Sequence, residues 1–195
     1  VDDIQAILTN SAAGAASIQI ATVLVCVGLV VHAAGLISTR GTASSTSESL
    51  GIVLIVASIA VWITSSGLGT AMAEMGEKYV AAAGAGDAGT AGSIHIAAGF
   101  IQSANVAANT IGALLAGIGW LFMGMAYRRS DAKGALSFIP LGWLALIQGL
   151  ILIVATLVIN QVVSIEVGSQ VSGISFLLIV IWSVSRGVAL IQADN

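Results

Sequence analysis

Five long stretches without an acidic or basic side chain follow one another along the chain. They cover residues 4–39, 49–73, 88–127, 134–165 and 167–185. A helix needs about 20 predominantly apolar residues to cross the hydrocarbon core of a bilayer. A helix also satisfies its backbone hydrogen bonds internally, as a membrane requires, and the alternating strands of a membrane barrel are not visible in the sequence. The sequence therefore predicts an all-α, polytopic transmembrane bundle of about five membrane-spanning helices.

The composition supports the same interpretation. Charged residues make up 8% of the chain and hydrophobic residues 57%, with a mean hydropathy of +1.04. An ordinary soluble domain is about 25% charged, so this composition excludes a soluble enzyme and a disordered chain. The single cysteine, Cys26, excludes a scaffold of internal disulfides. The net charge of −3 offers no basic surface for nucleic acid, and we expect no nucleic-acid partner.

The apolar runs also predict where the spans begin and end. We expect spans at residues 17–38, 50–72, 94–126, 136–159 and 167–191, within one bundle over residues 1–195. The tripeptide Ser47-Glu48-Ser49 is typical of a helix start. Pro140 falls in the first turn of the fourth span, where a missing N–H costs little. The Gly/Ala-rich connection over residues 74–93 predicts a flexible external loop.

The basic residues predict the orientation in the membrane. Five spans place the two termini on opposite sides, and cytoplasmic loops carry an excess of lysine and arginine. With the C-terminus inside, five basic residues face the cytoplasm and only Lys78 faces outward. The cytoplasmic set comprises Arg40, Arg128, Arg129, Lys133 and Arg186. We therefore expect the N-terminus outside and the C-terminus in the cytoplasm, with the last four of these residues as cytoplasmic anchors.

The third span carries a polar face. His95 is followed by Gln102, Asn105 and Asn109 at offsets of 7, 10 and 14 residues, which lie on one side of an α-helix. Unpaired amides are costly in hydrocarbon, so this face should point into protein. One interpretation is hydrogen bonding between helices, at about 0.6 kcal/mol for each bond. The other is a polar pathway or a ligand pocket.

Small residues continue along the same span. Gly112, Ala116 and Gly119 predict close helix–helix packing, either within the chain or with a second copy. His32 lies in the first span, where it either packs with a hydrogen-bond partner or titrates in a functional cavity.

No set of residues typical of catalysis or metal binding is evident. The two histidines, His32 and His95, are predicted at opposite depths, which argues against a bis-histidine haem or a metal site. No Gly-x-Ser-x-Gly elbow with a His/Asp partner appears. His95 with Glu74 or Glu77 could form a general base at the outer surface. No cofactor is evident, and apolar grooves for lipid, quinone or carotenoid have no sequence signature.

Two segments on either side of the basic loop carry a resemblance. Residues 119–129 read Gly-Trp-Leu-Phe-Met-Gly-Met-Ala-Tyr-Arg-Arg, and Pro140-Leu141-Gly142-Trp143-Leu144 is followed by Gln148-Gly149. This pattern is a helix that ends in arginine, followed by a short loop and a Pro-x-Gly-Trp helix start. With it, about residues 95–190 resemble small uncharacterised prokaryotic multi-pass integral membrane proteins. The resemblance implies the same multi-pass topology in a prokaryotic cytoplasmic membrane and no particular activity.

These observations favour a non-catalytic integral membrane protein. The leading hypothesis is an accessory or structural subunit of a larger membrane complex or self-assembly, whose partners are membrane lipids and other membrane subunits or a second copy. The alternative is a small-molecule or lipid-binding membrane protein, or a passive channel or facilitator, that uses the polar face of the third span. A membrane enzyme that uses His95 is the third hypothesis.

Overall fold

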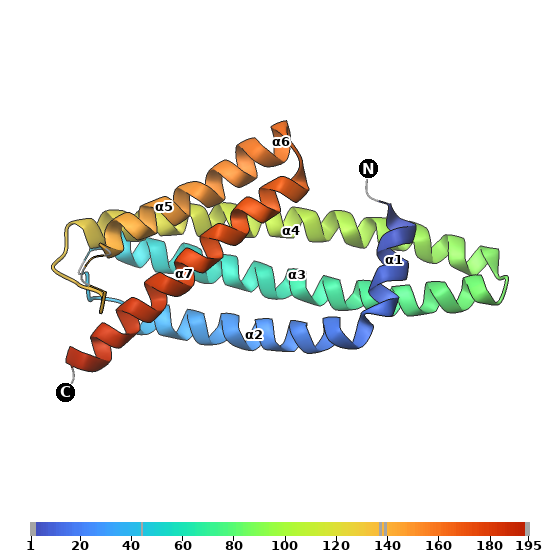
Figure 1. Cartoon of the computed structure of the whole chain (residues 1–195), viewed down its shortest axis with the longest axis horizontal. Coiled ribbons are helices and arrows are strands. Elements are labelled where there is room, and N and C mark those ends of the chain that lie inside the picture. Colours follow the sequence, from blue (N-terminus) through green and yellow to red (C-terminus); the bar gives the residue numbers. More distant parts are fainter. Residues whose placement is uncertain (1–2, 44, 137, 139, 194–195) are drawn as a thin grey trace. The chain divides into compact units, whose positions relative to one another are not determined.

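The computed structural model describes residues 3–43, 45–136, 138 and 140–193. Within these residues every regular element is a helix, and Figure 1 shows them coloured along the chain. The elements are α1 (Ile4–Ala13), α2 (Ala15–Ser38), α3 (Thr46–Gly84), α4 (Ala88–Arg128), α5 (Leu141–Val154), the π-helical turn η1 (Ala155–Ile159), α6 (Asn160–Val162) and α7 (Ile165–Ala193). Because α5, η1 and α6 form one apolar segment, Leu141–Val162, the described residues contain five helices long and apolar enough to cross a membrane. The predicted all-α fold with five helices able to span a membrane is thereby confirmed.

Residues 74–93 depart from the expected loop. Helix α3 continues to Gly84 and α4 already begins at Ala88, so the connection is a short turn. Alanine has the highest helix propensity, and the alanine-rich sequence on both sides of the turn extends both helices. Gly86 adopts a φ of 75°, the left-handed conformation that glycine tolerates best. The backbone N–H and side chain of Thr90 donate hydrogen bonds to Asp87, which caps α4, and they lower the pKa of its carboxyl.

The fourth span also begins later than expected. Helix α5 starts at Leu141 rather than at residue 136, and Pro140 occupies the N-cap position with an extended ψ of 113°. Proline disfavours the helical conformation in the residue before it, so the helix starts after Pro140 and not before it.

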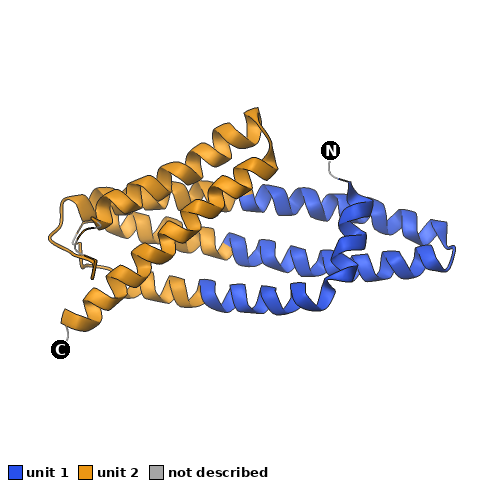
Figure 2. Cartoon of the chain, viewed as in Figure 1, with its two compact units in different colours: residues 1–29, 61–109 blue, residues 30–60, 110–195 orange. Residues whose placement is uncertain are grey.

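The chain divides into two compact units, shown in Figure 2, where the sequence suggested a single bundle. Unit 1 comprises residues 1–29 and 61–109, and unit 2 comprises residues 30–60 and 110–195. In unit 1, α1 lies across α3 and α4 (Figure 1). Its fully buried Leu8 packs with Met72 of α3 and Ala98 of α4. The apolar residues of α1 therefore form the centre of a small core with the hairpin of α3 and α4.

Unit 2 holds the larger core. Trp120, Met123, Leu152 and Trp182 are almost fully buried there. Glycines let the helix backbones come close: a Cβ on Gly119 would lie 3.0 Å from the carbonyl oxygen of Gly51, and one on Gly149 would lie 2.7 Å from that of Gly117. Helix α4 thus contacts α3 on one side and α5 on the other, as small residues allow in membrane helices.

Candidate functional site

Two of the four polar residues predicted on one face of α4, Asn105 and Asn109, contact each other. In unit 1, Ser65 of α3 donates a short hydrogen bond to the side-chain oxygen of Asn105. The amide nitrogen of Asn109 donates to the Ser65 hydroxyl at 2.8 Å and to the side-chain oxygen of Asn105 at 3.2 Å. These three side chains form a closed hydrogen-bonded group, which we call the Ser65–Asn105–Asn109 cluster. Ser65 was not singled out from the sequence, because an isolated serine in an apolar helix is common.

The other residues of that face lie apart from the cluster. Gln102 is half-buried on α4, and His95 is exposed. His95 lines a shallow pocket of about 390 Å³ with Tyr79 and Gly92. Glu74, a suggested partner of His95, instead forms an exposed ion pair with Lys78 at 2.6 Å.

His32 lies in unit 2, whereas His95 lies in unit 1. The Nδ1 atom of His32 is 3.4 Å from the hydroxyl of Ser183 on α7, and its ring centroid is 6.4 Å from that of Trp120. The half-buried imidazole thus packs against an aromatic ring with one polar neighbour. Among the described residues, no three His, Cys, Asp or Glu side chains gather into a group that could hold a metal ion.

The small residues predicted for packing are all buried on α4. Ala116 is fully buried, and Gly112 and Gly119 are buried as well. Gly119 makes the close approach to α3 described above.

Two polar side chains that the sequence does not predict to be buried lie in the interior. Gln148 on α5 is fully buried, and neither its amide nitrogen nor its amide oxygen has a hydrogen-bond partner. Its backbone oxygen accepts a 2.8 Å hydrogen bond from Ser175 of α7. Glu48 is also fully buried. Gln148 is a single polar residue in an apolar run, and Glu48 belongs to a polar helix start, so neither carries a sequence signal of burial. Only the packing reveals that both face the interior.

The basic residues near the α4–α5 connection separate into two kinds. Arg128, Arg129 and Lys133 are exposed. Arg186 of α7, the fourth predicted cytoplasmic anchor, is only 7% exposed. Its Nη1 donates to the backbone oxygen of Lys133 at 2.8 Å, and its guanidinium carbon lies 5.7 Å from the ring centroid of Tyr127. Arg186 therefore fastens the loop to α7.

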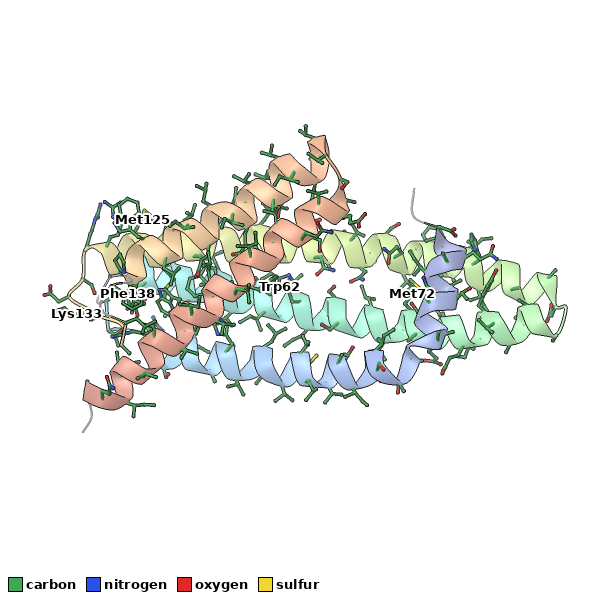
Figure 3. All side chains as sticks on the ribbon, viewed as in Figure 1. Trp62, Met72, Met125, Lys133 and Phe138 are labelled. Carbon is green, nitrogen blue, oxygen red and sulfur yellow. The ribbon has the colours of Figure 1, made fainter. Side chains whose placement is uncertain are left out.

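A pocket of about 570 Å³ opens between the end of α4 and the start of α5. We call it the α4–α5 pocket. The side chains that matter most for its chemistry are Tyr127, Arg128, Ser130, Lys133 and Trp143. The guanidinium of Arg128 lies 4.5 Å over the ring of Trp143, a cation–π contact. Figure 3 shows Lys133 on the same connection.

Comparisons with protein-family models, curated proteins and solved structures found no match.

Proposed function

We propose that the chain is a non-catalytic integral membrane protein that serves as an accessory or structural subunit of a membrane assembly, with α2 as its contact helix. The carrying observation is how little α2 packs against its own chain. Only 6% of its most apolar stretch is buried, against 28% to 44% in the other four spans. A helix that contributes so little to the internal core is available for contacts with a neighbouring membrane helix.

One side of α2 has the residues that such contacts favour. Ala21, Gly28 and Gly35 are exposed and lie seven residues apart, so they share one face of the helix. A Cβ on either glycine would meet nothing within 4 Å. In membranes, close helix pairing uses small residues because lipid provides no hydrophobic driving force between helices. This face therefore favours association with a second copy or with another membrane subunit.

The Ser65–Asn105–Asn109 cluster supports the same proposal. Its hydroxyl and amide groups bond to one another across α3 and α4. Groups that pair in this way stabilise helix packing, which favours a structural role over a polar pathway along α4.

The orientation and location are part of the proposal. The basic residues of the α2–α3 and α4–α5 connections support a cytoplasmic position for both loops, by the positive-inside rule. The N-terminus then lies outside and the C-terminus in the cytoplasm. The resemblance of residues 95–190 favours the cytoplasmic membrane of a prokaryote.

The assembly is tested by native mass spectrometry of the chain extracted from its native membrane in mild detergent. We expect a particle heavier than the 19.5 kDa chain, made of further copies or of other subunits. Gly28→Leu and Gly35→Leu should abolish most of this larger particle, because leucine holds the helices apart. A monomer for the wild-type chain would overturn the proposal.

Ala34→Leu is the matched control for these variants. Ala34 is exposed and precedes Gly35, but it lies about 100° around the helix from it. The control places the same leucine side chain at nearly the same depth on another face, so the larger particle should survive. If the control and the glycine variants lose it equally, the small-residue face is not the contact.

A further inference from the structure

The α4–α5 pocket is built by a close approach of two helix ends. Gly142, in the first turn of α5, packs against Arg128 at the end of α4. A Cβ at position 142 would lie 2.6 Å from the backbone nitrogen of Arg128. Only glycine permits this approach, and it brings the Arg128 side chain over the neighbouring Trp143. The arginine is thereby held at the pocket instead of extending freely into solvent.

The loop side of the pocket is held as well. Arg186 donates to the backbone oxygen of Lys133, and the backbone N–H of Ala135 donates to the oxygen of Ser185, both at 2.8 Å. Two hydrogen bonds to α7 therefore hold the loop backbone, one at Lys133 and one at Ala135. Among the described residues that line the pocket there are two cations, Arg128 and Lys133, and no carboxylate. Its chemistry suits a phosphate group, which arginine and lysine recognise through charge-assisted hydrogen bonds.

An apolar track leads away from this pocket along α5. Trp143, Ile147, Leu150 and Val154 are spaced by three or four residues, so they share one face of the helix. All four are exposed, between 38% and 56%. Tryptophan beside a basic residue is typical of the headgroup level of a bilayer. A phosphate in the pocket would therefore have acyl chains alongside this face, as in a phospholipid.

We propose that the α4–α5 pocket binds the headgroup of an anionic phospholipid, with its phosphate between Arg128 and Lys133 and its acyl chains along the Trp143 face of α5. Basic pockets between membrane helices recognise anionic headgroups by this chemistry. The site uses no residue of α2, so lipid binding in this pocket can be tested independently of the proposed assembly.

The test measures lipid selectivity of the full chain. The purified protein is incubated in mild detergent with equal amounts of phosphatidylglycerol and phosphatidylcholine of the same acyl chains, and retained lipid is counted by native mass spectrometry. We expect roughly tenfold preference for phosphatidylglycerol, since each basic residue near the surface contributes a severalfold increase in affinity. The double variant Arg128→Gln/Lys133→Gln should bring the two lipids close to parity. No preference in the wild-type chain would overturn the proposal.

A second double variant distinguishes the pocket from general surface attraction. Arg40→Gln/Arg129→Gln removes the same charge from exposed residues that do not line the pocket. This variant should keep the preference for phosphatidylglycerol. An equal loss of preference in both double variants would show attraction by net charge alone.

The single variant Lys133→Gln covers the case in which Arg128→Gln/Lys133→Gln fails to fold, because the exposed Lys133 is held through its backbone. It should lower the preference severalfold, and an unchanged value would exclude the pocket.

Competition with free glycerol phosphate separates the two sources of a phosphate group. A large excess should leave bound phosphatidylglycerol in place, because the acyl chains contribute to affinity. Displacement of the lipid by the free ester would show a site for a water-soluble anion and overturn the assignment to phospholipid.

Discussion

Glu48 is a carboxylate buried completely at the start of α3. Its oxygens accept hydrogen bonds from the backbone N–H groups of Gly41 and Ala43, at 2.8 and 3.0 Å, and from the hydroxyl of Thr42 at 3.2 Å. The backbone N–H of Glu48 donates to the hydroxyl of Ser45 at 3.1 Å. The bond from the Glu48 N–H to Ser45 is one half of a capping box, and the carboxylate itself reaches back to the preceding loop. The side chain thus ties the connection between α2 and α3 to the helix it precedes.

We expect Glu48→Ala to destabilise the protein by about 1–3 kcal/mol, because it removes the acceptor of the buried backbone N–H of Ala43. Glu48→Gln keeps one acceptor oxygen and should cost less. The free energy of unfolding, measured by denaturant titration in detergent, checks both variants. Glu77→Ala is the control, since Glu77 is exposed on α3 and its loss should stay within about 0.5 kcal/mol. Equal effects of Glu48→Ala and Glu77→Ala would contradict a structural role for the buried carboxylate.

At the scale of elements, α1 packs so closely on the hairpin of α3 and α4 that one glycine decides the fit. Met72, labelled in Figure 3, and Gly76 lie one turn apart on α3 beneath α1. A Cβ on Gly76 would collide with the backbone oxygen of Leu8 and lie 2.9 Å from the backbone nitrogen of Ala12. Backbone cannot move aside as a flexible side chain can, so α1 must shift to admit even a methyl group.

The same substitution on α3 should therefore have opposite effects at two positions. Gly76→Ala should destabilise unit 1 by about 1–3 kcal/mol through overpacking. Gly69→Ala should stabilise α3 by up to about 1 kcal/mol, because alanine favours helix and nothing lies within 4 Å of the added Cβ. Hydrogen exchange of α1 amides reports the first effect, and the denaturation midpoint reports the second. Stabilisation by both substitutions would mean that α1 does not rest on Gly76.

At the scale of the whole molecule, the proposed orientation makes a prediction for labelling from one side. In a Cys26→Ser background, Ala85→Cys places a thiol in the exposed turn between α3 and α4, and Asp131→Cys places one in the basic loop. A membrane-impermeant maleimide added to intact cells should label the variant at position 85. It should label the variant at position 131 only after permeabilisation. Labelling of position 131 in intact cells, and of position 85 only after permeabilisation, would show the opposite orientation in the membrane.

The five spans could be predicted because membrane insertion depends on the length of apolar runs, which the sequence displays directly. The helical extensions over residues 74–84 and 88–93 could not be found this way. Hydropathy distinguishes segments that can face lipid from segments that face water. It does not distinguish a helix from a loop in the more polar segments outside the bilayer. There, the helix propensity of alanine and the packing of Met75 and Tyr79 against the core around Leu8 favour helix.

The candidate sites were less accessible to prediction because they depend on partners far away in the sequence. The helical period placed Asn105 and Asn109 on one face, but their shared partner, Ser65, comes from another helix. Nothing in the sequence shows that Arg186 is buried or that the backbone oxygen of Lys133 lies beside its guanidinium. The α4–α5 pocket needs the approach of Gly142 to Arg128, which only the packed helices reveal.

The tight turn at residues 85–87 has a practical consequence for imaging this protein. Its residues are exposed, and it joins the ends of two long helices. Exposed turns of small residues are where inserted domains are best tolerated. A helical protein grafted there, with its first and last helices continuous with α3 and α4, would add a recognisable mass to a chain of 19.5 kDa. The turn is thus a natural attachment point for a fiducial marker in electron cryomicroscopy.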